Sequence, residues 1–192
     1  MKIIEPKAEL VDAIDSDAIL RKLELCGRVS HQSESRGAPE NFIRKIIKLG
    51  HESVLEHASL TFHIVCDRAI QNELVRHRHT GYTVESTRYV NYVELTFVDP
   101  PLDVDTLMLI EDEYREMIVH GCPPEIARAV LPMCLKSELY MTANLSEWRH
   151  ILKQRTAKAA HPQMRLIMNQ VLETFKKILP VIVEDINHEK IA

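Results

Sequence analysis

Hydrophobic and polar residues alternate most regularly over residues 59–66. Leu60, Phe62, Ile64 and Cys66 fall on one side of this alternation, which predicts a half-buried strand. A second alternating segment and two runs rich in β-favouring residues predict further strands. The strands predicted from the sequence are 2–5, 60–66, 89–97 and 139–143.

Hydrophobic residues spaced three and four apart predict helices between these strands. Pro39 opens one helix and Gly50 ends it, which are the termini that these two residue types favour. Asp67 and Asn144 precede two other helices as N-cap residues, and Glu147 completes a capping-box pattern with Asn144. The predicted helices are 17–29, 39–50, 67–75, 107–121, 123–132, 144–155 and 162–179.

Two connecting segments are predicted to be irregular. A loop is expected at 31–39, which is rich in serine, glycine and charge, and a tight turn at 81–83. Because neither a repeat nor a linker interrupts the chain, residues 1–192 are expected to form a single domain. Strands and helices interleave unevenly, which favours an α+β fold with an antiparallel or mixed β-sheet flanked by helices.

The composition predicts a folded protein whose positive site is local. Of the 192 residues, 45% are hydrophobic and 27% charged, and the net charge is -4. Such a chain can bury a core, whereas a duplex-DNA-binding protein is normally basic overall. No apolar stretch reaches the roughly 18 to 20 residues that span a membrane. We therefore expect a small anionic ligand, with neither nucleic acid nor a membrane as partner.

Cysteine and glycine usage indicates the state of the thiols and the kind of phosphate site that the chain can form. The four cysteines form no C-x-x-C pair and no signal peptide precedes them. This pattern predicts reduced thiols in a cytoplasmic protein, most simply as small buried side chains. The five glycines form neither a G-x-G-x-x-G motif nor a Walker loop. A nucleotide phosphate would therefore be bound by side chains, and arginine is best suited to that task.

The densest group of basic residues lies in the middle of the chain. Guanidinium groups are permanently charged, planar donors for phosphate, so we interpret the group as an anion site. Most basic runs are a solvated surface or a localisation signal, but histidines interrupt this one and apolar segments flank it. The group comprises Arg76, His77, Arg78, His79, Ser86, Thr87 and Arg88.

Two further clusters carry candidate ligand-binding residues. The histidines of 51–57 are six apart, which does not fit the i, i+4 spacing of a zinc-binding helix, so no metal site is predicted there. That segment is either a polar turn or the wall of a site. The other cluster combines Arg128, Asn144, His150 and Arg155. Arg155 lies on the apolar face of its helix, where a charge needs a ligand or a structural ion pair with a glutamate.

No activated nucleophile is evident in these clusters. The sequence contains no nucleophile elbow. A Ser-His-Asp arrangement stays open, because its members need not be neighbours in sequence.

Arg76-His77-Arg78, followed by seven residues and Ser86, resembles the RHR-x7-S signature of the flavin-dependent thymidylate synthases. The string from Glu85 to Tyr89 strengthens this resemblance. Four other blocks resemble segments of the same family, in the same order and at the same spacing. These blocks are 50–57, 127–132, 142–155 and 160–165.

The resemblance implies an antiparallel sheet flanked by helices and a homotetramer with active sites at subunit interfaces. It implies a flavoprotein of dTMP biosynthesis, in which NADPH reduces FAD, methylenetetrahydrofolate donates the carbon and dUMP is methylated. The positions that it implies for FAD are Ser53, Arg76, His77, Arg78, Asn144, Leu145, Ser146 and His150. Those that it implies for dUMP are Glu73, Arg76, Val84, Glu85, Ser86, Thr87, Arg88, Arg128 and Arg155.

The resemblance assigns the main catalytic role to Arg155, which would hold the uracil ring. A guanidinium beside an acidic imide stabilises its anion, so Arg155 would favour ionisation at N3. Arg88 and the backbone amides near Ser86 would hold the phosphate. Nothing in the sequence near Ser86 is poised to activate it, so a binding role is predicted for this serine.

The chain departs from the family pattern at several positions. Glu73 stands where the family often has glutamine, and a carboxylate cannot donate a hydrogen bond as an amide does. Ser146 replaces a common arginine, and residues 83–84 replace Asn-Glu. His161 and Gln163 replace Gln and Glu in the last block.

Three rival functions are considered beside the resemblance. A metal-dependent hydrolase predicts bound zinc and inhibition by a chelator. A nucleic-acid-binding module predicts steep salt dependence without flavin. An inactive homologue would be a structural subunit, but the chain keeps the family's arginines. These arginines are Arg76, Arg78, Arg88, Arg128 and Arg155.

Overall fold

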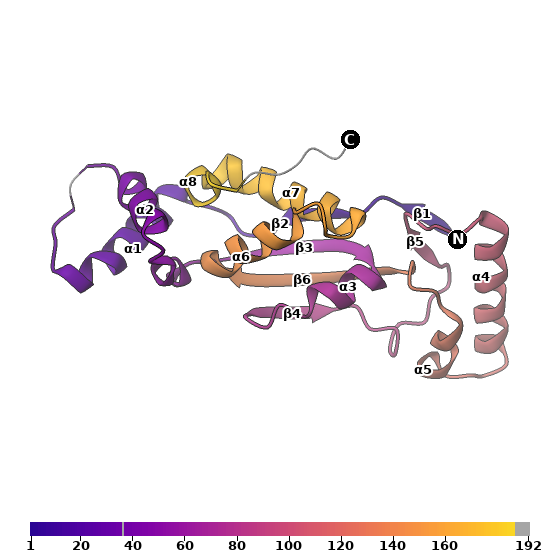
Figure 1. Ribbon diagram of the computed structural model, residues 1–192. Helices are drawn as coiled ribbons and strands as arrows, with labels where there is room; N and C mark the ends of the chain where they lie inside the picture. Colours follow the sequence, from indigo (N-terminus) through magenta and orange to yellow (C-terminus); the bar gives the residue numbers. More distant parts are fainter. Residues whose placement is uncertain (36, 187–192) are drawn as a thin grey trace.

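A four-stranded antiparallel sheet forms the centre of the molecule (Figure 1). The computed structural model describes residues 1–35 and 37–186. The two longest strands lie in the middle of the sheet and define its two faces. In spatial order the strands are β2 (Lys7–Leu10), β3 (Ser59–Asp67), β6 (Lys136–Asn144) and β4 (Thr80–Val84).

The pairing of β3 with β6 sorts their side chains by face. Phe62 pairs with Met141, and both are fully buried. The next pair along, His63 with Tyr140, points to the opposite face, where Tyr140 is exposed. One face of the sheet is therefore hydrophobic and the other polar, as the predicted alternation in β3 requires.

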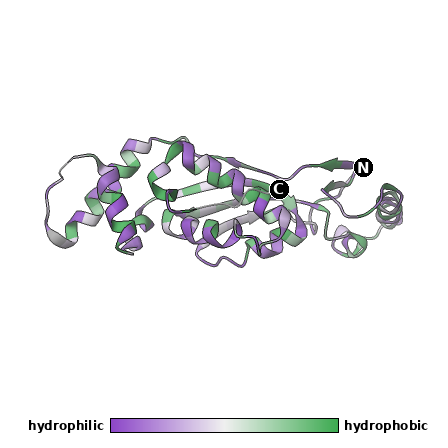
Figure 2. Ribbon diagram, turned by 45° about the horizontal axis from the view of Figure 1, so that its top comes forward, coloured by the Kyte–Doolittle hydropathy of each residue, from purple (hydrophilic) through white to green (hydrophobic). Residues whose placement is uncertain are grey.

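Helices α6 (Leu145–Arg155) and α7 (Pro162–Ile178) cover the hydrophobic face, and α8 (Pro180–Val183) continues from α7. Trp148 of α6 and Phe175 of α7 pack against Phe62, with ring centroids 5.1 and 6.0 Å from its ring. Figure 2 shows hydrophobic and hydrophilic residues on the same helices, as expected where each helix buries one side. This packing fixes α6 on the sheet.

Two helices form one end of the elongated molecule (Figure 1). They are α1 (Ser16–Arg28) and α2 (Pro39–Lys48). The short 3-10 helix η1 (Val29–His31) follows α1 on the way to α2, and a second one, η2 (Glu52–His57), leads from α2 into β3. Gly50 follows α2 with φ +73°, a left-handed conformation that suits glycine and was predicted for this helix end.

A smaller lobe forms the other end (Figure 1). In it β1 (Lys2–Ile4) and β5 (Thr96–Val98) pair in parallel beside α4 (Val104–Val119), α5 (Pro124–Ala127) and the 3-10 helix η3 (Arg128–Val130). This lobe has a hydrophobic core of its own. The buried members of that core are Leu95, Phe97, Leu107, Tyr114, Ala127, Cys134 and Leu135.

The predicted α+β fold with an antiparallel sheet and flanking helices is confirmed. Both predicted N-caps are confirmed as well. The Asp67 side chain accepts a hydrogen bond from Ile70 N at 2.7 Å and so begins α3 (Arg68–Leu74). The Asn144 side chain accepts one from Glu147 N at 2.8 Å at the start of α6.

The strand predicted at 89–97 is wrong over most of its length, because only its end belongs to β5. Tyr89 and Val93 are 77% and 86% exposed, so a strand here would bury no face. Instead, the amides of Tyr89 and Val90 donate to the carbonyl of Ser86 in a turn. Burial, which β-propensity alone does not supply, decides against the strand.

The tight turn predicted at 81–83 is also wrong, because these residues form the middle of β4. Tyr82 pairs with Met141 of β6, so the partner strand decides the conformation despite the neighbouring glycine. Strand β2 was not predicted. The predicted loop at 31–39 begins inside η1, and Arg36 lies outside the described residues. No helix in the described part of the chain is both long and apolar enough to cross a membrane.

Candidate active site

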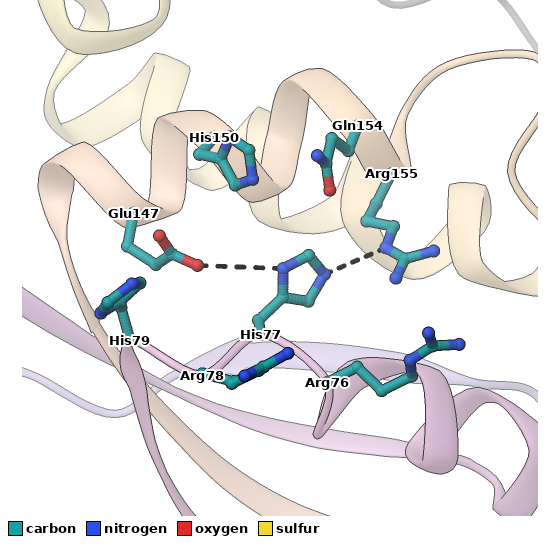
Figure 3. A pocket seen from close by; sticks show the side chains of 8 residues that line it. All are labelled: Arg76, His77, Arg78, His79, Glu147, His150, Gln154 and Arg155. Carbon is teal, nitrogen blue, oxygen red and sulfur yellow. Dashed lines mark hydrogen bonds and ion pairs between the residues drawn. The ribbon is translucent and has the colours of Figure 1, made fainter.

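A cavity of about 610 Å³ lies between the segment that follows α3 and one side of α6 (Figure 3). Three arginines and three histidines line it, against one carboxylate. Such a lining favours an anionic ligand. The lining residues are Arg76, His77, Arg78, His79, Glu147, His150, Gln154 and Arg155.

The backbone after α3 turns His77 inward and leaves its neighbours at the surface. His77 N donates to Leu74 O at 3.1 Å, which extends the end of the helix by one turn. The Tyr82 hydroxyl donates to Leu74 O at 2.6 Å and lies 3.1 Å from His77 O, so β4 supports the same turn. Arg76 and Arg78 are exposed on either side of buried His77.

Arg155, near the end of α6, is held by two groups. Its Nε donates to His77 Nε2 at 3.0 Å, and its Nη1 donates to Glu73 Oε2 at 3.0 Å. The ion pair with a glutamate, which the sequence left open for Arg155, is therefore present. The guanidinium still lines the cavity, so this pair does not remove it from the candidate site.

His77 is neutral at physiological pH. Burial lowers its pKa to about 4, and the positive charge of Arg155 and the nearby His150 act in the same direction. The Nδ1 atom of His77 lies 3.8 Å from Glu147 Oε1. Its two ring nitrogens therefore face different partners, a guanidinium donor on one side and a carboxylate on the other (Figure 3).

Several residues predicted to contact dUMP, including Arg88 and Ser86 at its phosphate, form a second group, beside α5. Arg128 Nη1 donates to Thr87 Oγ1 at 3.5 Å, and Arg88 Nε donates to Glu125 Oε2 at 2.9 Å. The hydroxyl of Ser86 accepts a hydrogen bond from Arg88 N at 3.2 Å. The fold thus brings these predicted dUMP residues together, but none of them lines the cavity of about 610 Å³.

Two other predicted dUMP residues lie between these groups. Val84 ends β4 and packs against the main core. The carboxylate of Glu85 accepts from Lys136 Nζ at 3.0 Å and from the Tyr92 hydroxyl at 2.9 Å. Its oxygens are thus engaged within the chain.

The predicted FAD residues are divided between several places. Arg76, His77, Arg78 and His150 line the cavity together, whereas Ser53 lines a different cavity of about 1100 Å³ between α1, α2 and η2. The remaining three begin α6. Asn144 is its N-cap, Leu145 is fully buried, and Ser146 is partly exposed in the first turn.

Sequence reasoning missed Glu147 and Gln154 as lining residues. Glu147 was interpreted only as part of a capping box, yet its carboxylate faces His77. Glu147, His150 and Gln154 recur at i, i+3 and i+7, a spacing that puts them on one side of α6. This polar stripe, beside the apolar one that carries Arg155, was the signal that could have found them.

Among residues 1–35 and 37–186, no group of three or more histidine, cysteine or carboxylate side chains is arranged to hold a metal ion.

Comparison with known proteins places this architecture in a family. Residues 9–181 match the model of Thy1, the thymidylate synthase complementing protein. A probable flavin-dependent thymidylate synthase of Mycobacterium phage L5 is 36% identical over 191 residues, which cover 85% of this chain and 79% of that relative. A flavin-dependent thymidylate synthase of Geobacter sulfurreducens is 34% identical over 157 residues, covering 75% of this chain and 68% of that one.

A solved structure agrees with the sequence relatives. The UMP/dUMP methylase PolB from Streptomyces cacaoi, bound with 5-Br dUMP, has a TM-score of 0.79 and 27% identity to this chain, and the match covers 96% of each. The family match, the relatives and the shared fold agree, and the chain belongs to the Thy1 family of flavin-dependent thymidylate synthases.

Proposed function

We propose that this protein, as a single domain of residues 1–192, is an FAD-dependent thymidylate synthase that methylates dUMP to dTMP. Methylenetetrahydrofolate supplies the one-carbon unit and NADPH the reducing equivalents, so that tetrahydrofolate and NADP+ are released with dTMP. The observation that carries this proposal is the Arg155 guanidinium in a strongly cationic cavity, beside Arg76 and Arg78. Family membership supports it.

The cavity suits FAD in the charge of its walls. A flavin dinucleotide carries a diphosphate, for which arginine forks are the best side-chain partners. Arg76, Arg78 and His150 would hold the cofactor together with the first turn of α6, where a helix N-terminus favours phosphate. Bound flavin, once reduced, supplies the hydride that no side chain can provide.

Arg155 acts on the uracil ring in this proposal. Its terminal nitrogens donate to the ring and stabilise negative charge at N3, which raises electron density at C5. The Nη1 atom now donates to Glu73, so nucleotide binding replaces or shares that contact. Arg88 and the backbone amides near Ser86 hold the phosphate, with Thr87 and Arg128 as further contacts to the nucleotide.

We propose a homotetramer in which each site draws residues from two copies of the chain. The Arg155 group lies along α6, and the Arg128 group lies beside α5 in the small lobe (Figure 1). The cavity that Arg155 lines includes no residue of the Arg128 group. A nucleotide that contacts both groups is therefore best held where two copies meet.

Subunit mixing tests this arrangement. Arg155→Ala and Arg128→Ala are each expected to abolish activity as separate preparations. After co-refolding in equal amounts, roughly a quarter of the sites would combine two intact halves, so activity should return to about that fraction. If a co-refolded mixture has the size of a tetramer but recovers no activity, both arginines serve the site of one chain.

The proposed reaction is tested by a flavin absorbance spectrum and a product assay. The purified protein is incubated with FAD, titrated with NADPH with and without dUMP, and then assayed for dTMP with methylenetetrahydrofolate. Flavin bands that bleach and dTMP that accumulates are expected. A colourless protein that ignores FAD would favour an inactive homologue or a nucleic-acid-binding protein, and activity that depends on zinc would favour a hydrolase.

UMP is a second candidate substrate. The similar PolB is described as a UMP/dUMP methylase, and this chain has the same fold. We propose dUMP as the preferred nucleotide. Competition between labelled UMP and dUMP in one reaction decides between them, because the ratio of the two products gives the ratio of their kcat/KM values.

A further inference from the structure

The two partners of Arg155 differ in how far they are exposed. The His77 side chain is 7% exposed, whereas the Glu73 side chain is 37% exposed and the Arg155 side chain 21%. An ion pair at the surface exchanges easily with water and ligands, but a buried contact does not. The Nε side of Arg155 is therefore fixed, whereas the contact of Nη1 with the Glu73 carboxylate is exchangeable. Nη2 donates to the backbone carbonyl of Glu73 at 3.5 Å.

The bond from Arg155 determines which nitrogen of His77 carries the proton. Arginine Nε always bears hydrogen and cannot accept, so His77 Nε2 must be the acceptor at 3.0 Å. In a neutral imidazole the proton then lies on Nδ1. That atom faces the Glu147 carboxylate at 3.8 Å, which favours a hydrogen on that side.

The groups around His77 agree with a neutral ring. Arg155 and Glu147 face it from α6, and His150 of the same helix lies with its ring centroid 6.4 Å away. The hydroxyl of Tyr82 in β4 donates to the backbone carbonyl of His77. Protonation at Nε2 would place two cations in contact and remove the acceptor, so Arg155 would lose its anchor.

We infer that His77 is a positioning residue: as the Nδ1-protonated tautomer beside Glu147, it holds Arg155 by Nε, so that Nη1 can exchange the Glu73 carboxylate for the nucleotide. The inference deepens the proposed function and rests on it for the role of Arg155. It gives the central histidine of the Arg-His-Arg motif a role that neither neighbouring arginine can perform. A neutral imidazole can accept the hydrogen bond from Arg155 Nε, whereas a guanidinium has no acceptor atom.

The first test is the tautomer of His77, measured on the protein without any ligand. Long-range 1H–15N NMR of protein labelled at histidine is expected to show Nδ1 protonated and Nε2 bare at pH 7, with the signal assigned by its loss in His77→Gln. His63 gives an internal contrast, because its Nε2 lies 2.7 Å from Glu138 and should carry the proton. A protonated Nε2 on His77 would overturn the inference, whatever the enzyme's activity.

The second test is kinetic and compares His77→Ala, His77→Gln and the matched control His63→Gln, all at saturating FAD. The amide oxygen of glutamine can still accept from Arg155 Nε, but alanine cannot. We expect kcat/KM for dUMP to fall roughly 10- to 100-fold in His77→Ala, which corresponds to the loss of one charge-assisted hydrogen bond. In His77→Gln most of the wild-type kcat/KM should be retained. His63→Gln, on the open sheet face, should keep wild-type values.

Two outcomes of the kinetic test would contradict the positioning role. One is a His77→Ala enzyme that matches wild type once FAD saturates it, since His77 would then serve FAD alone. The other is equal loss in His77→Gln and His77→Ala with both proteins folded. A wild-type protein that forms no methylated nucleotide refutes the proposed function instead, and leaves the tautomer result to be judged by itself.

Discussion

Arg149 lies on α6 directly before His150, but its side chain points into the molecule and is only 1% exposed. It donates to Glu52 of η2 at 3.0 and 3.2 Å and to Asp185 beyond α8 at 2.6 and 2.8 Å, and it also contacts the Ile182 carbonyl. One guanidinium thus ties three segments together. It also lowers the pKa of Asp185 to about 2.

Replacing Arg149 by methionine keeps much of the length and removes the charge. The Glu52 and Asp185 side chains are 29% and 46% exposed, so water can rehydrate them and the full cost of a buried unpaired charge is not reached. We expect a loss of about 3 kcal/mol in the free energy of unfolding, at the lower end for a broken buried pair. For a chain of this size the midpoint of thermal unfolding falls by about 6 to 12 °C.

Arg44→Met is the matched control. Arg44 also binds a carboxylate through two nitrogens, since its Nε and Nη2 each donate to an oxygen of Glu184 at 2.8 Å. The Arg44 and Glu184 side chains, however, are 51% and 44% exposed. Urea unfolding followed by circular dichroism should show a much smaller loss for Arg44→Met, because a solvated pair contributes little. Equal losses in Arg149→Met and Arg44→Met would refute the reasoning that burial gives Arg149 its importance.

Three further predictions concern other parts of the molecule. His77 has a pKa of about 4 when folded and an ordinary value near 6.5 when unfolded, so the unfolded chain binds the extra proton between these pH values. Stability should therefore be complete above pH 6.5 and decline by up to about 3 kcal/mol as the pH falls to 4, and urea titrations of His77→Gln should show a flatter profile. Ser86→Ala should keep turnover but raise the KM for dUMP, and a folded variant without turnover at saturating dUMP would make Ser86 catalytic. Trp148→Phe leaves the Leu60 carbonyl without its 3.0 Å donor and opens a void, so about 2 to 4 kcal/mol should be lost; circular dichroism is the measurement, because Trp148 is the only tryptophan.

Patterns that reflect local burial predicted most of the fold. The alternation around Phe62 identified β3, and the capping signals at Asp67 and Asn144 fixed the starts of α3 and α6. The errors arose where tertiary contacts override local preference. Gly81 suggests a turn until β6 is beside it, and the segment at 89–93 has strand propensity but leaves Tyr89 and Val93 exposed.

The candidate site could be predicted in its residue types but not in its grouping. Arg76, His77 and Arg155 were selected from the sequence, and they do meet, although 78 positions separate His77 from Arg155. Neither the Glu73–Arg155 pair nor the separation of Ser53 into another cavity is visible from spacing. Both depend on how elements distant in sequence pack against each other. The spacing of residues along a single sequence does not predict such packing.

The two separate hydrophobic cores give the halves of the proposed site unequal stability. Arg155 belongs to the layer built on the large core, whereas Arg128 follows Ala127 of the small one. A lobe with few buried side chains opens at a lower free energy than the body to which it is attached. On gentle warming the protein should therefore stop binding the nucleotide phosphate while it still binds flavin. Its enzymatic activity should then be lost at temperatures where the absorbance of bound flavin remains.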